Sequence, residues 1–86
     1  MTAPIYITFV INGEEAETEG TLITPLRTCV EDVLDAMRTL RPVSDWELRY
    51  GSGELIPPDK YDLPISAFGF EKGAVLFLTL RVGAGG

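Results

Sequence analysis

One segment of the chain has the apolar spacing of an amphipathic helix, and the segments on both sides of it alternate like strands. The helical stripe is made by Leu26, Val30, Val33, Leu34, Met37 and Leu40. This spacing predicts one helix of about four turns, which ends before Pro42 because proline disfavours helical geometry in the residue that precedes it. One candidate start is Thr24 as the N-cap before Pro25. The other is a capping box of Thr28 and Glu31.

The segments outside the helix have the period of strands. Residues 5–11 place three isoleucines and a phenylalanine on one face. Asn12-Gly13 follows and predicts a hairpin turn, because both residues tolerate positive φ. We also expect a brief helical turn at residues 63–68. The predicted strands are residues 5–11, 14–23, 46–50, 54–56 and 74–82, and the last is apolar enough to lie centrally.

A single amphipathic helix among strands has to bury its apolar stripe on one face of a sheet. The order of hairpin, helix, strand, short strand, long loop and final strand is that of the β-grasp. We therefore predict an α+β fold with a mixed sheet of four to five strands and one main helix on one face. The domain is expected to span residues 1–82, followed by a flexible glycine-rich tail at residues 83–86. A chain of 86 residues has little room for a large active-site cleft, so we do not expect an enzyme.

Charge and composition argue against several functions. Thirteen acidic and seven basic side chains give a net charge of −6, the wrong sign for nucleic-acid phosphates or an anionic membrane surface. Histidine is absent and Cys29 is the only cysteine, so we expect no disulfide and no metal site. Cys29 itself is expected to be a half-buried apolar residue. The first residues lack the pattern of a signal peptide, and no apolar run has membrane-spanning length, so we expect a cytoplasmic protein.

The residues that point to chemistry are the last four, Gly83-Ala84-Gly85-Gly86. At a background glycine usage of ~7%, a Gly-Gly pair at that place arises in about one chain in 200, so chance is a poor explanation. Residues without a β-carbon can enter a channel too narrow for side chains, which leaves the carboxylate of Gly86 open to attack on a nucleotide phosphate. The alternative is a solvated chain end without a function.

Three stretches of the chain resemble the second half of ubiquitin: the loop at residues 59–63, the strand end Leu78-Thr79-Leu80-Arg81 and the pair Gly85-Gly86. The element order is similar over the whole chain, and the residues are similar from about Trp46 onward. The resemblance implies a ubiquitin-like modifier. An activating enzyme would adenylate Gly86 with ATP, a conjugating enzyme would take the acyl group as a cysteine thioester, and a lysine of a target protein would receive it. No cofactor would be bound by the chain itself, and a deconjugating protease would be a further partner.

By the same resemblance, the activating enzyme is expected to read Arg81, Gly83 and Ala84. The tail is one residue longer than that of ubiquitin and lacks its second arginine, which implies a different activating enzyme. The chain has two lysines, Lys60 and Lys72, and these are the candidate acceptors for a further copy.

The sheet face suggests a second contact. Where ubiquitin exposes its aliphatic recognition patch, this chain is expected to place Arg49 and Thr79, with Phe77 beside them. An exposed aromatic ringed by polar groups often marks a docking surface, so we expect partner enzymes to bind there. The alternative is ordinary sheet surface, or cover by an extra loop.

With these departures the chain resembles the divergent ubiquitin-like proteins of bacterial conjugation systems, some of which act in antiphage defence. Two other functions stay open. A sulfur carrier, similar to the small β-grasp proteins of molybdopterin and thiamine synthesis, would also be adenylated at Gly86 and would form a thiocarboxylate there. A non-covalent β-grasp adaptor would bind through its sheet face and would not need the glycines.

Overall fold

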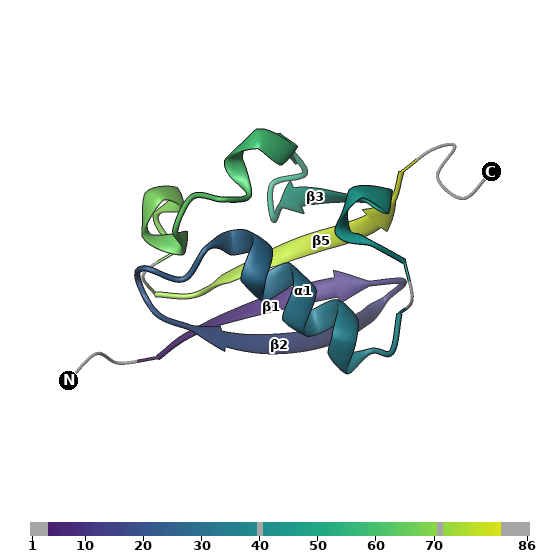
Figure 1. Cartoon of the computed structure of the whole chain (residues 1–86), viewed down its shortest axis with the longest axis horizontal. Coiled ribbons are helices and arrows are strands. Elements are labelled where there is room, and N and C mark those ends of the chain that lie inside the picture. The colour runs from purple at the N-terminus through teal and green to yellow at the C-terminus, as the bar shows by residue number, and fades with distance from the viewer. Residues whose placement is uncertain (1–3, 40, 71, 82–86) are drawn as a thin grey trace.

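A five-stranded mixed sheet with one helix across one of its faces forms the body of the protein (Figure 1). The computed structural model describes residues 4–39, 41–70 and 72–81. The predicted α+β layout is confirmed, whereas the predicted boundary at residue 82 and the tail at residues 83–86 lie outside the described residues. The elements are β1 (Ile5–Ile11), β2 (Glu14–Gly20), α1 (Leu26–Ala36), β3 (Trp46–Tyr50), β4 (Leu55–Ile56) and β5 (Ala74–Leu80), with 3₁₀ turns η1 (Val43–Asp45), η2 (Pro58–Lys60) and η3 (Ile65–Phe68).

The strand order is β2-β1-β5-β3-β4, so β5 is the central strand, as its apolar run predicts. β5 runs parallel to β1 and antiparallel to β3. Alternate residues of these strands point toward α1 and most of them are buried, which forms the core with the apolar stripe of the helix. The largest fully buried side chains are those of Phe9, Ile7, Ile11, Leu26, Leu48, Ile56, Ile65, Leu76, Leu78, Val30, Val33 and Cys29. Within the described part of the chain, no helix is long and apolar enough to cross a membrane.

The hairpin between β1 and β2 forms where it is predicted. Asn12 and Gly13 have φ values of 52° and 81°, and Ile11 pairs with Glu14 across the turn. β2 ends at Gly20, three residues short of the predicted end, because the chain turns immediately afterwards. In that turn the Oγ1 of Thr24 accepts the backbone N–H of residue 21 at 2.9 Å, so this hydroxyl does not cap the helix.

Both predicted starts of α1 were wrong. The N-cap is Pro25, which has no side-chain hydrogen bond to the helix. The first free N–H groups of the helix are instead satisfied from the long loop before β5: Leu26 donates to the carbonyl of Leu63 at 3.0 Å, and Arg27 donates to that of Tyr61 at 2.8 Å. A side-chain cap is unnecessary where a distant backbone segment supplies the acceptors.

The helix is also shorter than predicted, because it ends at Ala36 in a Schellman motif. Arg38 adopts the left-handed conformation with φ 57°. The N–H of Thr39 donates to the carbonyl of Leu34, and that of Arg38 donates to the carbonyl of Asp35, both at 3.0 Å. The expected last member of the stripe, Leu40, lies outside the described residues. The sequence around Arg38 does not indicate this end of the helix, because glycine is the usual residue at the left-handed position and this chain has arginine there.

Candidate functional site

The end of β5 is the part of the described structure closest in sequence to the glycine-rich residues. Arg81 follows the strand, its side chain is exposed, and its backbone N–H donates to the carbonyl oxygen of Asp45 at 2.8 Å. The residues to which the sequence assigns adenylation and recognition by an activating enzyme, Gly83, Ala84, Gly85 and Gly86, lie outside the described residues.

η1 has a surface ion pair at its last residue and is followed directly by a buried residue of the core. A carboxylate oxygen of Asp45 lies 3.6 Å from Nη1 of Arg41, and the next residue, Trp46, is buried opposite Leu80 of β5. Within the described residues the indole Nε1 of Trp46 has no hydrogen-bond partner, so this side chain contributes through packing. The position at which β5 leaves the sheet is therefore set by backbone and core contacts.

The three residues predicted to form a docking surface share the sheet face opposite α1. Arg49 lies directly opposite Phe77 in the β3–β5 ladder, and Glu47 lies opposite Thr79. The Phe77 side chain is 36% exposed. The Arg49 guanidinium is held along the sheet, because Nη1 donates to the carbonyl of Gly53 at 3.0 Å and Nη2 donates to the carboxylate of Glu47 at 3.1 Å.

Two further residues extend this surface into a row, and the sequence reasoning missed both. Val10 of β1 lies opposite Phe77, and Leu55 of β4 lies opposite Arg49. Val10 is half-buried and Leu55 is 44% exposed. We call Val10, Phe77, Arg49 and Leu55 the sheet-face row. Alternation along β1 already places Val10 on the face away from the helix, but the sequence did not reveal that β1 pairs with β5.

Cys29 is fully buried on α1, with 0% of its surface exposed, so the expectation of a half-buried side chain was wrong. Burial raises the pKa of its thiol to about 11, with a smaller contribution from the carboxylate of Asp32. A buried neutral thiol is a poor nucleophile, in keeping with its reading as an apolar core residue. The candidate acceptors Lys60 and Lys72 are both exposed.

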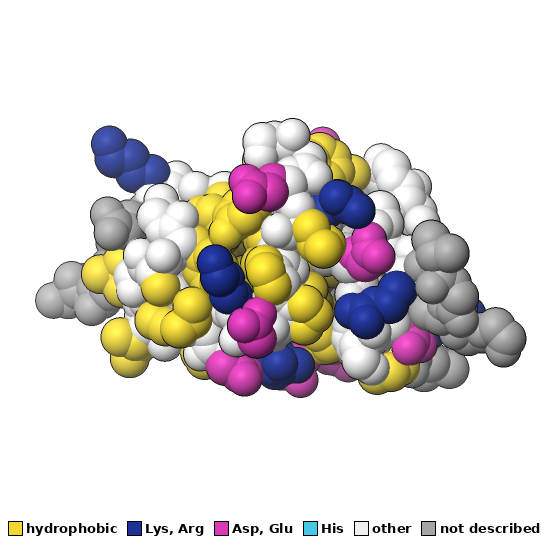
Figure 2. Space-filling model, turned by 90° about the horizontal axis from the view of Figure 1, so that it is seen from above, with side chains coloured by type: hydrophobic (Ala, Val, Ile, Leu, Met, Phe, Trp, Pro, Cys, Tyr) yellow, Lys and Arg dark blue, Asp and Glu magenta, His cyan; other side chains and the backbone are white. Residues whose placement is uncertain are grey.

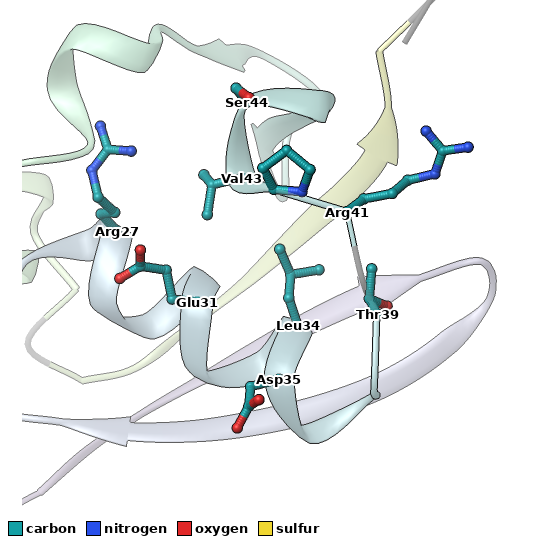
Figure 3. A pocket seen from close by; sticks show the side chains of 9 residues that line it. Arg27, Glu31, Leu34, Asp35, Thr39, Arg41, Val43 and Ser44 are labelled. Atoms are coloured by element: carbon teal, nitrogen blue, oxygen red, sulfur yellow. The ribbon is translucent and has the colours of Figure 1, made fainter. Parts of the chain in front are cut away.

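A groove that the sequence reasoning did not anticipate lies between α1 and the segment that leads into β3 (Figure 3). Its volume is about 440 Å³, and Leu34 and Val43 face it from its two sides. Seen from the side of the 3₁₀ turns, apolar side chains form a band across the middle of the molecule, bordered by side chains of both charge signs (Figure 2). The groove is lined by Arg27, Glu31, Leu34, Asp35, Thr39, Arg41, Pro42, Val43 and Ser44.

Solved structures similar to this chain are ubiquitin-like domains. The ubiquitin of Caldiarchaeum subterraneum matches with a TM-score of 0.71 and 17% identity, over 92% of this chain and 95% of that chain. A ubiquitin-like domain in a splicing factor matches with a TM-score of 0.71 and 20% identity, over 94% and 72%. The EccD5 ubiquitin-like domain of Mycobacterium xenopi matches with a TM-score of 0.56 and 13% identity, over 92% and 96%. These similarities confirm the predicted ubiquitin-like β-grasp and concern the fold alone.

Comparison with curated proteins finds no match. A family model described as "Protein of Unknown function (DUF2604)" matches residues 2–86, which is nearly the whole chain. The protein is thus a ubiquitin-like β-grasp domain in fold, and in sequence it belongs to the DUF2604 family.

Proposed function

We propose that this chain is a ubiquitin-like modifier, joined to target proteins through the carboxylate of Gly86. The observation that carries the proposal is the way β5 ends: the backbone of Arg81 is bonded to Asp45 at 2.8 Å, its side chain is exposed, and five residues, 82–86, follow it. A well-held body followed by residues with small or absent side chains suits insertion of a carboxylate into a narrow enzyme channel. The proposal is the same whether Gly86 is the last residue to be translated or becomes the last residue when a longer precursor is cleaved.

The chemistry requires one adenylyl transfer followed by two acyl transfers. A carboxylate oxygen of Gly86 attacks the α-phosphorus of ATP in the activating enzyme, and pyrophosphate leaves. A cysteine thiolate of a partner enzyme then displaces AMP and forms a thioester. Finally, the ε-amine of a target lysine displaces that thiolate and forms an isopeptide bond, which a deconjugating protease would hydrolyse. The thiol has to come from a partner, because Cys29 is buried and its pKa is raised to about 11.

The sheet-face row supports a second contact with these enzymes. Phe77 is an aromatic side chain, 36% exposed, between Val10 and Arg49 in the sheet, and Arg49 is already oriented by two hydrogen bonds. A pre-oriented arginine beside an aromatic side chain loses little conformational entropy on binding, which is typical of residues that anchor interfaces. Contact at this row would orient the body while the tail enters the active site.

The setting that we infer is a bacterial conjugation system in the cytoplasm, of the kind that acts in antiphage defence. Its support is the way the tail departs from that of ubiquitin: one extra residue and no second arginine. Genes for an adenylating enzyme, a cysteine-bearing conjugating enzyme and a metalloprotease beside this one would agree with that setting. Genes for cofactor synthesis would contradict it.

The test is incubation of the full chain with its adenylating and conjugating enzymes, ATP and a lysine-bearing acceptor, followed by intact-mass analysis. We expect ATP-dependent pyrophosphate exchange and adducts that link Gly86 to lysine. Deletion of Gly86 should abolish both signals, whereas Lys72→Ala should leave the pyrophosphate exchange unchanged. Exchange of one carboxylate oxygen for sulfur in the presence of a sulfur donor, without lysine adducts, would instead identify a sulfur carrier.

A non-covalent adaptor is the second candidate, favoured by the exposed Phe77 in the sheet-face row. It predicts that a chain lacking Gly85 and Gly86 keeps its partner and its function. The modifier requires that the same deletion abolishes function while partner binding through the sheet face survives. One truncated chain therefore separates the two candidates.

A further inference from the structure

The groove between α1 and η1 has an apolar floor and is shaped by two elements that meet through the core. Leu34 is 4% exposed and rises from the helix, and Val43 of η1 is half-buried on the other side (Figure 3). Pro42 adds a rigid apolar ring at the rim. A volume of about 440 Å³ accommodates two or three side chains of a bound segment.

Counted with the two acids beside the groove, acidic side chains outnumber basic ones around it within the described residues. Arg27 donates to a carboxylate oxygen of Asp62 at 2.8 Å, and Arg41 pairs with Asp45 at 3.6 Å, so both arginines are matched by acids that do not line the groove. Figure 3 shows the Arg41 guanidinium directed away from the helix.

Two acidic side chains of the groove are exposed on α1. Glu31 and Asp35 lie one helical turn apart on the same side of the helix. Neither forms an ion pair within the part of the chain that the structure describes, although Arg27 lies one turn before Glu31 and attracts it at longer range. The wall formed by α1 therefore offers two carboxylates to an incoming group.

We propose that this groove binds an extended segment of a protein partner in which a lysine or arginine lies next to an aliphatic residue. The aliphatic side chain packs on Leu34 and Val43, where it displaces water from apolar surface. The cation lies between Glu31 and Asp35, and its methylene stem covers the edge of the floor. A neutral or acidic segment would gain only the first contact.

η1 links one wall of the groove to the end of β5. Val43 and Ser44 line the groove, and the carbonyl of the next residue, Asp45, holds the backbone of Arg81 at 2.8 Å. A partner that grips the chain at Arg81 can thus also occupy the groove without reaching across the molecule. The inference does not require conjugation at Gly86, because it rests on the described residues of α1 and η1 alone.

Nuclear magnetic resonance titration of the ¹⁵N-labelled full chain tests the groove directly. The probe is an N-acetylated, C-amidated hexapeptide of alternating leucine and arginine, and the comparison peptide has glutamine in place of arginine. We expect saturable shifts of the amides of Glu31, Asp35 and Val43, with a smaller shift at Arg81, and about tenfold weaker binding of the glutamine peptide. Failure of the arginine peptide to shift these amides, or equal binding of both peptides, would overturn the proposal.

A matched pair of variants separates the groove from general attraction to an acidic protein. The double variant E31Q/D35N removes the two groove carboxylates, and E15Q/E17Q removes two exposed acids from β2. Both lower the net negative charge by two. We expect about tenfold weaker binding in the first variant and less than about twofold in the second. An equal loss in the two variants would show that the attraction is not local to the groove, which contradicts the proposal.

Discussion

The backbone N–H of Arg81 donates a hydrogen bond to the carbonyl oxygen of Asp45 at 2.8 Å, which joins the end of the central strand to the turn beside the groove. The bond uses no side-chain atom of Arg81, so the exposed guanidinium remains available for contacts with another protein. Replacement of the Arg81 side chain can therefore test recognition by another protein without removing the backbone hydrogen bond to Asp45.

Arg81→Ala should leave the fold intact and weaken activation. Because the donor to Asp45 is a backbone group, the free energy of unfolding should change by less than about 0.5 kcal/mol. Loss of a charge-assisted contact with the activating enzyme should lower kcat/KM for pyrophosphate exchange by about tenfold or more. Lys72→Ala removes an exposed cation before β5 and is the matched control. Equal kinetics in the two variants would show that Arg81 is not read by the enzyme.

Phe77→Ala should weaken partner binding at the sheet-face row, whereas Tyr6→Ala should have little effect. Both are aromatic residues of the same open face, 36% and 47% exposed, but Tyr6 lies opposite Glu19 rather than beside Arg49. Loss of an interface anchor costs about 2 kcal/mol of binding free energy, a factor of about thirty in Kd. Isothermal titration of the partner enzyme with each variant gives the comparison, and similar Kd values for both variants would remove the special role of Phe77.

Arg38→Gly should stabilise the protein. Arg38 ends α1 with φ 57°, a conformation that costs a non-glycine residue about 1 kcal/mol and that glycine adopts freely. Glycine two residues earlier, in Ala36→Gly, replaces the last residue of the helix and should destabilise by up to about 1 kcal/mol. Chemical denaturation of both variants measures the two changes. A loss of stability in Arg38→Gly would contradict the left-handed conformation of Arg38 at the end of the helix.

Stability should fall between about pH 9 and pH 11 because of Cys29. Burial raises the pKa of this thiol from 9.0 to about 11, so the folded state keeps a proton that the unfolded state has lost in that window. The stabilisation is complete below pH 9 and is lost as the pH rises through the folded pKa. The upper limit of the loss is about 2–3 kcal/mol.

Cys29→Ala provides the control for this pH dependence. The variant lacks the titrating thiol and should show a shallower decline of unfolding free energy with pH, although its stability is lower throughout because a buried sulfur is removed. Parallel pH profiles of the two proteins would contradict the raised pKa. Slow alkylation of the folded wild-type protein at pH 8 is an independent check, since the reactive species is the thiolate.

The elements with strong local signals were predicted from the sequence, and so was their arrangement. Alternation over residues 5–11 and the Asn12-Gly13 turn specified the hairpin, and the apolar run of the last strand specified a central position, all confirmed by the structure. These signals are local because side-chain direction in a strand and positive φ in a turn depend on neighbouring residues alone. The glycine-rich end is known from the sequence alone, since residues 82–86 lie outside the described part.

The start of α1 and both surfaces depended on contacts between distant segments. Leu63 and Tyr61 supply the acceptors for the first N–H groups of the helix, so no cap residue near Thr24 or Thr28 was needed. Val10 and Leu55 join the sheet-face row only because β1 pairs with β5 and β4 with β3.

The sequence by itself determined the hairpin, the helix stripe, the central strand and the glycine-rich segment at residues 83–86. The tertiary structure alone decided where α1 begins, which side chains share the sheet face, and that a groove with two exposed carboxylates lies beside η1. The physical reason is that propensity and periodicity act over a few residues, whereas strand pairing and the satisfaction of buried backbone groups are settled only when the whole chain has folded.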